Sequence, residues 1–299
     1  MKLFIVRTFC FFVLCSCGIR IQSIAVGYDR PVQVIDDKVN KRYLIPNYGA
    51  DKAKGKGRIF QRSYKGETSI FVDGLTNPLG GVIVDTVLYV SNDSTNVLGY
   101  GLKSGKEVFR IKISESKQLV SLASDGKGHI YATDFWGTNV FKVDVRSNTY
   151  EIVCDLGFIH ASGLVYDKSK NRLVFITMMQ SSKIYAISLR DRKVKLLYDT
   201  HLESCDGLAM DKNGYFYSGS WKTGSIYRFS LKAGDASHNA IISGIETPVY
   251  SFVDISKGVI AIPSWNSNAI YYSSLPPADD NRCRKIESLL IEKWIVNKQ

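Results

Sequence analysis

The sequence predicts an all-β fold, a ring of six four-stranded sheets, and three observations support this. A pattern of alternating apolar and polar residues returns roughly every 40 to 50 residues. Each copy divides into four short strands at turns rich in Gly, Asn, Asp and Ser, as in the segment from Leu119 to Leu156. A short apolar segment before the first copy can complete the last one. These features are typical of a six-bladed β-propeller with a central channel.

The six copies define the six predicted blades in order along the chain. They begin near Pro31, Pro78, Leu119, Ala161, Cys205 and Pro248. The first interval is the longest because the first copy carries an insertion, NYGADKAKGKGR, between Asn47 and Arg58. A seventh blade would require a further copy, and none is found.

The last copy has only about three strands before Pro276 and Pro277. The segment SIAVG, from Ser23 to Gly27, supplies the fourth strand and closes the ring. Closure of this kind leaves no open sheet edge between the first and last blades. We therefore expect the propeller to span residues 23–275, followed by a tail, 276–299, that ends in a short helix.

Residues 1–17 have the composition of a secretory signal. Lys2 and Arg7 precede a short apolar stretch, which is too short to span a membrane. The sequence Leu-Cys-Ser-Cys that ends at Cys17 is similar to a bacterial lipobox, in which the cysteine is lipidated and tethers the protein to a membrane. The alternative is an ordinary cleaved signal. Either way, we expect an extracytoplasmic protein: secreted, periplasmic or lipid-anchored.

The charge is strongly basic, with a formal net charge of +11. Such a charge favours anionic surfaces or ligands. Nine Lys or Arg residues and one Asp lie between Lys38 and Lys65. This segment is either a loop that faces phosphate, polysaccharide or membrane, or a solvated hairpin tip. The repeats lack the basic face with interleaved aromatic residues that nucleic-acid binding requires. We expect a monomer with a small-molecule or protein ligand and no nucleic-acid partner.

Three cysteines lie beyond the signal: Cys154, Cys205 and Cys283. None has the paired spacing of a zinc site. Cys154 falls in a predicted outer strand and Cys205 in an inner one, which argues against a disulfide between them. Cys283 either clamps the tail onto a blade or is a free thiol.

The candidate ligand positions follow from the geometry of a propeller, because the first strand of each blade lines the channel. Ser162 and Asp206 lie at the starts of two such strands. Asn92, Asp93 and Asp134 lie where second strands end.

Three of the four tryptophans, Trp136, Trp221 and Trp265, follow the second strands of different blades at equivalent positions. They form either an aromatic collar that stacks on a sugar or an apolar ligand, or packing contacts between blades.

Asp206 is the most informative single residue. A carboxylate at the mouth of an inner strand is costly unless it binds a cation or backbone amides. In the first case it is a ligand to Ca²⁺ or another divalent cation, with Asp134, Asn92 and Asp93 as further oxygen donors. In the second it caps the channel, and no cofactor is needed.

Common catalytic motifs are missing from the sequence. There is no Gly-x-Ser-x-Gly elbow, no phosphate-binding glycine loop and no His-Glu-x-x-His. Asn92-Asp93-Ser94 is a glycosylation sequon, which has a meaning only in a eukaryotic host.

The repeats SGLVYDKSKNRLVFIT and CDGLAMDKNGYFYSGSW resemble the six-bladed propellers of the gluconolactonase, regucalcin and strictosidine synthase superfamily, and also NHL-type propellers. The resemblance covers Pro31 to Leu275. It implies a channel metal held by a Glu, two Asn and an Asp. The Asp falls at Asp206, before Gly207 and after Cys205 in place of a proline. The Asn positions fall at Ser162 and near Val120, and the Glu has no match.

We therefore expect an exported propeller that binds a small molecule or partner at the channel mouth, without most of the lactonase metal ligands, rather than an enzyme. Two alternatives stay open. One is a metal-dependent lactone or ester hydrolase of the gluconolactonase type with a rearranged site. The other is an interaction scaffold that uses the outer blade surfaces and the basic loop between Lys52 and Arg58.

Overall fold

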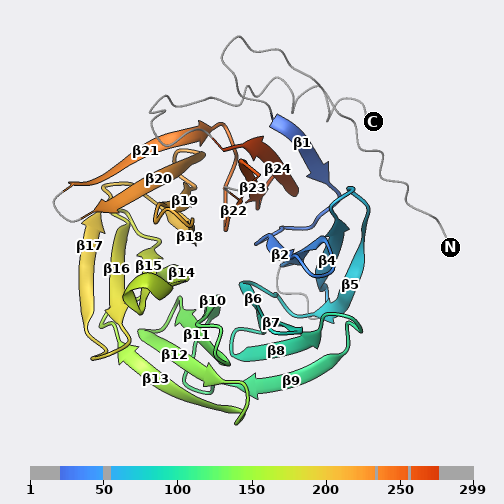
Figure 1. The fold of residues 1–299 in the computed structure, drawn as a ribbon, viewed down its shortest axis with the longest axis horizontal. Coiled ribbons are helices and arrows are strands. Elements are labelled where there is room, and N and C mark those ends of the chain that lie inside the picture. The colour runs from blue at the N-terminus through green and yellow to red at the C-terminus, as the bar shows by residue number, and fades with distance from the viewer. Residues whose placement is uncertain (1–20, 50–54, 233–234, 255–256, 276–299) are drawn as a thin grey trace.

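A computed structural model describes residues 21–49, 55–232, 235–254 and 257–275. In it, six four-stranded antiparallel sheets surround a central axis, as Figure 1 shows. The predicted six-bladed β-propeller is confirmed. The predicted signal with Cys17, Cys283 and the tail 276–299 lie outside the described residues, as does part of the basic loop.

Each of the first three blades is a meander whose strands follow one another from the axis outward. Blade one contains β2 (Ile35–Asp37), β3 (Arg42–Asn47), β4 (Gly57–Ser63) and β5 (Thr68–Leu75). Blade two contains β6 (Gly81–Val84), β7 (Val87–Asn92), β8 (Asn96–Gly101) and β9 (Glu107–Lys112). Blade three contains β10 (Leu119–Ser124), β11 (His129–Asp134), β12 (Asn139–Asp144) and β13 (Thr149–Asp155).

Blades four and five repeat this meander. Blade four contains β14 (Ala161–Asp167), β15 (Arg172–Thr177), β16 (Lys183–Ser188) and β17 (Val194–Asp199), with a 3₁₀ turn, η1 (Lys168–Lys170), after its first strand. Blade five contains β18 (Cys205–Met210), β19 (Phe216–Ser220), β20 (Ser225–Lys232) and β21 (Asp235–Ser243). In the described part of the chain, no helix has the length and apolar character to cross a bilayer.

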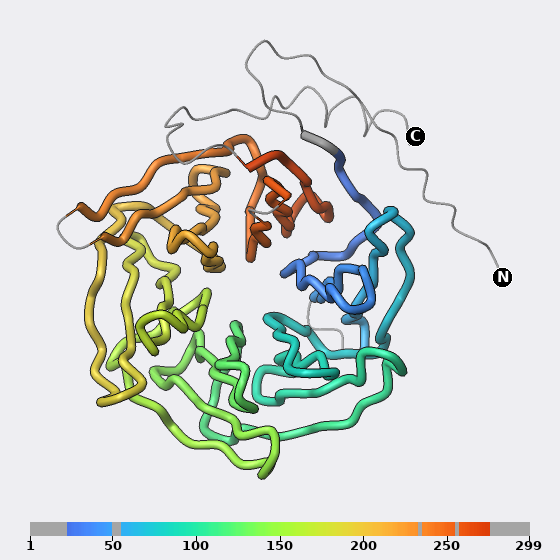
Figure 2. The backbone as a smooth tube through the Cα atoms, viewed as in Figure 1, coloured from blue at the N-terminus to red at the C-terminus, as the bar shows by residue number. Residues whose placement is uncertain are grey.

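Blade six is completed by the N-terminal strand. Its inner strands are β22 (Phe252–Asp254), β23 (Val259–Ser264) and β24 (Ala269–Ser274), and β1 (Ile21–Val26) pairs antiparallel with β24 as the outermost strand. The pairing includes Ala25 with Ile270. The predicted closure of the ring by N-terminal residues is therefore confirmed, and Figure 2 shows the blue N-terminal segment beside the red end of the ring.

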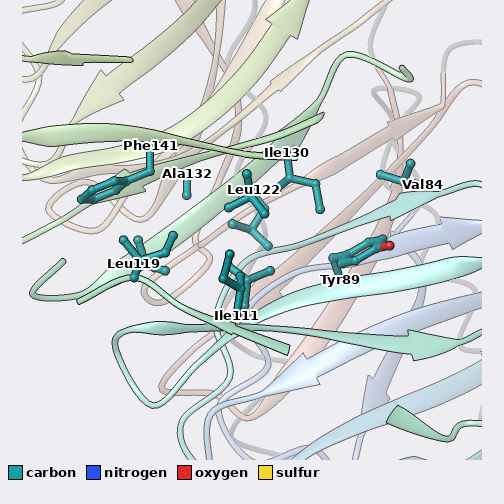
Figure 3. Close-up of a cluster of buried hydrophobic side chains, with 11 residues drawn as sticks. Val84, Tyr89, Ile111, Leu119, Leu122, Ile130, Ala132 and Phe141 are labelled. Atoms are coloured by element: carbon teal, nitrogen blue, oxygen red, sulfur yellow. The ribbon is translucent and has the colours of Figure 1, made fainter. Parts of the chain in front are cut away.

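The hydrophobic core is divided among the seams between blades, with one buried cluster at each of the six seams of the described ring. Figure 3 shows the seam between blades two and three, where Val84, Tyr89 and Ile111 face Leu119, Leu122 and neighbouring side chains. Because both faces of a blade are covered, the middle strands are buried almost throughout instead of alternating. β11 is buried at five of its six residues, whereas the outer strand β9 is mostly exposed.

The inner strands of neighbouring blades touch around the axis. The backbone N–H of Gly80 donates to the carbonyl of Val120 at 2.8 Å. Between blades four and five, a Cβ atom at Gly163 would lie 2.0 Å from the backbone nitrogen of Leu208. Only glycine permits this approach.

Replacement of Gly163 tests how much this contact contributes to the stability of the ring. We expect Gly163→Ala to lower the free energy of unfolding by about 3 kcal/mol or more, because the inner strands of blades four and five must separate. Urea denaturation followed by circular dichroism measures the change. Gly101→Ala is the matched control, since its Cβ would meet no backbone atom closer than 3.9 Å, and we expect a change within about 1 kcal/mol. Equal effects of the two substitutions would contradict the proposed role of Gly163.

Candidate functional site

One face of the ring brings together the chain segments that sequence analysis singled out. Successive strands of a blade are antiparallel, so the turns between second and third strands share a face with the connections between blades. We call this the connector face. The inner strands begin there, and the residues at their starts surround the mouth of the channel.

An apolar cluster occupies the mouth on the connector face. Its buried members are Val32, Val249 and Tyr250, and its half-buried members are Tyr48, Leu79, Trp221 and Trp265. The ring of Trp265 contacts both other aromatic rings of the rim, with centroid distances of 4.8 Å to Tyr48 and 6.2 Å to Trp221. The guanidinium of Arg30 lies 5.7 Å from the centre of the Trp265 ring. We call Tyr48, Trp221 and Trp265 the collar.

A polar chain lies beside this cluster and links three blades. The hydroxyl of Ser162 donates to Asp206 Oδ1 at 2.5 Å, and the backbone N–H of Gly207 donates to the same oxygen at 2.8 Å. The Tyr250 and Ser162 hydroxyls are 3.3 Å apart. The chain of hydrogen bonds therefore runs from Tyr250 through Ser162 to Asp206. Asp206 is only 9% exposed.

The second oxygen of Asp206 has a different environment. Among the described residues, no hydrogen bond to Oδ2 meets the usual distance and angle limits. The indole Nε1–H of Trp221 is buried and also makes no such bond, although it lies close enough to favour the carboxylate form of Asp206. Burial has the larger effect and raises the pKa of Asp206 above its ordinary value. The site thus offers one acceptor and one donor to a ligand.

The polar residues at the ends of the second strands bind the connections between blades. Three backbone N–H groups donate to the Asp134 carboxylate: Lys117 at 2.8 Å, Gln118 at 2.7 Å and Gly137 at 3.1 Å. Asn92 Oδ1 accepts from Thr76 N at 2.9 Å. Equivalent bonds join Asn47 to Asp29 N, Ser220 to the Glu203 carbonyl and Ser264 to the Glu246 carbonyl. These side chains fix the connections that lead into the inner strands.

Asn92 and Asp93 line a cleft of about 580 Å³ between blades one and two. Asp93 is exposed in a turn with a positive φ of 48°. Asn92 is buried, with its amide oxygen occupied, so the folded protein does not present this sequon asparagine at its surface. Three of the charged side chains in the cleft are paired: Arg110 with Glu107 at 2.7 Å, and Asp73 with Arg58 at 2.8 Å.

Trp136 lies apart from the other two tryptophans. It is 51% exposed and packs against Phe135 and His160, with centroid distances of 4.9 and 5.0 Å. Although the three tryptophans share a repeat position, Trp221 and Trp265 join the mouth cluster and Trp136 lies beside His160, at the entry to blade four.

No group of three or more His, Cys, Asp and Glu side chains within the described residues is arranged to hold a metal ion. Asp206 and Asp134 are engaged by different partners. Cys154 and Cys205 are free thiols. Burial raises the pKa of Cys154 to about 11 and that of Cys205 to about 12, so both are weak nucleophiles at neutral pH.

Two further contributors to the mouth, Tyr48 and Tyr250, lie at repeat positions that the sequence marks for ligand contact. Tyr48 takes the collar position of blade one, where a tyrosine replaces the tryptophan of blades five and six. Tyr250 joins the polar chain from the start of the blade-six inner strand.

The fold and the mouth define an all-β, six-bladed β-propeller. No family model matches the chain, and no curated protein matches it. Solved structures are similar in fold. A chain of the nidogen/laminin complex aligns with a TM-score of 0.62 and 14% identity over 85% of this chain and 89% of its own length. A structural genomics protein of unknown function from Bacteroides thetaiotaomicron VPI-5482 aligns with a TM-score of 0.66 and 14% identity, over 83% of this chain and 70% of its own.

The burial of Asp206 predicts a pH dependence of stability. Its native pKa is raised, so the folded state holds the proton more tightly than the unfolded chain, whose pKa is near the ordinary 3.8. This contribution is complete below pH 3.8 and is lost as pH rises through the native pKa. Urea denaturation of the wild type and Asp206→Asn across pH 4 to 8 measures it. Relative to Asp206→Asn, the wild type should lose up to about 1.4 kcal/mol per pH unit within that window. A difference that is constant with pH would contradict the raised pKa.

The bonds of Asp134 predict a large structural effect of its removal. Asp134→Ala leaves three backbone donors without their acceptor and should lower the free energy of unfolding by about 2–4 kcal/mol. Asp29→Ala is the control, because the Asp29 side chain is exposed, and it should change stability by less than about 0.5 kcal/mol. A small effect of Asp134→Ala in urea denaturation would mean that solvent satisfies these donors.

Proposed function

We propose that this protein is an exported β-propeller that binds a small molecule at the channel mouth on the connector face. The N-terminal sequence supports export. The observation that carries the binding proposal is the collar, in which three aromatic rings from blades one, five and six are in contact next to a buried carboxyl group. Ligand sites commonly combine aromatic lining with a few fixed polar groups.

The collar selects a ligand with a flat apolar face. The rings of Tyr48, Trp221 and Trp265 are half-buried and offer surfaces on which such a face can stack. Beside the collar, Asp206 Oδ2 can accept a hydrogen bond and the Trp221 Nε1–H, which lies near the same carboxylate, can donate one. A hydroxyl group satisfies both, because it can donate and accept. An ammonium group has donors only and would leave the indole N–H unsatisfied. A saccharide, with apolar ring faces and hydroxyl groups, meets these requirements.

Saccharide titrations of the collar variants test this function. The probes are D-glucose, D-galactose, N-acetyl-D-glucosamine and their oligosaccharides, and the measurements are tryptophan fluorescence and the melting temperature. We expect at least one probe to raise the melting temperature of the wild type. Trp265→Leu, which keeps apolar volume but removes the ring, should weaken its binding about 10- to 100-fold. Trp136→Leu is the matched control from the equivalent repeat position, and it should bind as the wild type does. Equal binding by all three proteins, or none by the wild type, would refute the proposal.

A second candidate function rests on Asp206 alone. The position of this carboxyl at an inner-strand start favours a metal-dependent hydrolase of lactones or esters with a rearranged ligand set, as in the gluconolactonase-like propellers that the repeats resemble. Turnover of D-glucono-1,5-lactone or an aryl ester in the presence of Ca²⁺, and its loss in Asp206→Ala, would support this alternative. Saccharide binding without turnover favours the binding protein.

A further inference from the structure

A buried arginine at the seam between blades six and one departs from the pattern of the repeats. Equivalent third-strand residues can be compared between the blades. In each blade, the residue compared is the one that pairs with the position four residues before the end of the second strand. In blade one this third-strand residue is Arg62. In the other blades it is Tyr100, Val143, Ile187, Phe229 and Ser273. Arg62 therefore places a cation in a core position, where it is 8% exposed.

The described contacts of Arg62 do not neutralise its charge. Its Nη1 donates to the carbonyl of Gly66 at 2.6 Å and to the hydroxyl of Thr68 at 3.0 Å. The guanidinium carbon lies 5.8 Å from the centre of the Tyr272 ring. Among the described residues, no carboxylate forms an ion pair with it. The half-buried Arg172, in contrast, pairs with Asp167 at 2.9 Å. An isolated buried charge is costly unless it is paired.

Two buried tyrosine hydroxyls lie close to the Arg62 guanidinium. Tyr28 is 6% exposed and Tyr272 is 8% exposed, and the hydroxyl oxygens of both are buried without a hydrogen-bond partner. Arg62 lies close enough to both hydroxyls, and Thr68 to that of Tyr28, to favour their ionised forms, although none of these contacts meets the usual distance and angle limits of a hydrogen bond. Tyr272 also interacts electrostatically with Tyr28, so the three polar groups are close together. Burial raises the pKa of both tyrosines, so both hydroxyls keep their protons at neutral pH and can donate.

We propose that Arg62, Tyr28 and Tyr272 bind a small inorganic anion such as chloride at the seam where the ring closes. The anion accepts hydrogen bonds from the two hydroxyls and from the guanidinium and neutralises the buried charge. A water molecule would satisfy the hydroxyls but leave the charge of Arg62 uncompensated. Because the site joins β4 of blade one, β24 of blade six and the connection after β1, the anion stabilises the closed ring.

The melting temperature of the purified chain in sodium chloride and in sodium gluconate, at equal ionic strength, tests the site. Gluconate is too large to enter a buried site. We expect the melting temperature to rise with chloride and to saturate, by about 2–4 °C at 100 mM for a dissociation constant near 20 mM. Arg62→Met should abolish this rise and still fold, since three other blades have Val, Ile or Phe at this position. Tyr272→Phe should weaken chloride binding about 5- to 10-fold.

Arg172→Met is the matched control, because it removes a cation that has its own carboxylate partner, and it should keep the full chloride effect. A crystal soaked in sodium bromide gives a second readout, and we expect an anomalous peak between Arg62 and the two hydroxyls. Equal wild-type melting temperatures in the two salts, a chloride effect that survives in Arg62→Met, or a bromide-soaked crystal with only water at this place would overturn the proposal.

Discussion

The contact between neighbouring inner strands at the axis is the constraint on which the rest of this structure depends. Between blades four and five the strands approach until a Cβ at Gly163 would meet the backbone of Leu208, and between blades five and six a Cβ at Gly207 would lie 2.6 Å from Tyr250 Cα. Backbone contact at this radius sets the angle between sheets. That angle lets each pair of blades bury a continuous apolar cluster, and it gathers the starts of six strands into one mouth. Larger residues at these positions would open the ring before they disturbed any single sheet.

Such close packing leaves little room for water, so polar groups near the axis must be satisfied by neighbouring chain segments. The second-strand ends show how this is achieved, because Asn47, Asn92, Asp134, Ser220 and Ser264 each bind the connection that leads into the inner strands. From the sequence alone, residues at these strand ends are candidate ligand donors. Their repetition in five blades is better explained by a structural need that every blade shares. A ligand at the axis needs only a few side chains, and these need not recur from blade to blade.

Sequence patterns were sufficient for the architecture and only partly sufficient for the site. The period of the repeats indicated six blades, and the missing strand of the last repeat indicated closure by N-terminal residues, because both depend on alternation and length alone. The partners of Asp206 depend on which blades become neighbours and how their side chains turn, which no local pattern encodes. Ser162 and Tyr250 lie 44 and 88 residues from their contacts in the polar chain. The division of the three tryptophans into the pair at the mouth and the exposed Trp136 likewise follows from blade-to-blade packing.

A repeat protein contains its own comparison set, because each position occurs once per blade in nearly the same environment. Four inner strands have an apolar residue where blade five has Asp206, namely Val32, Leu79, Val120 and Val249. Arg62 is the corresponding departure among the third strands, and it lies toward the opposite face. Burial penalises both charges by the same physics, yet the chain treats them differently. Asp206 receives two donors from its neighbours and a raised pKa, so it can become neutral. An arginine cannot lose its proton in this way, so its charge has to be balanced by another group. A buried acid that departs from its repeat can therefore be explained by protonation alone, whereas a buried arginine keeps its charge and needs a compensating partner, which is the reason we propose an anion beside Arg62.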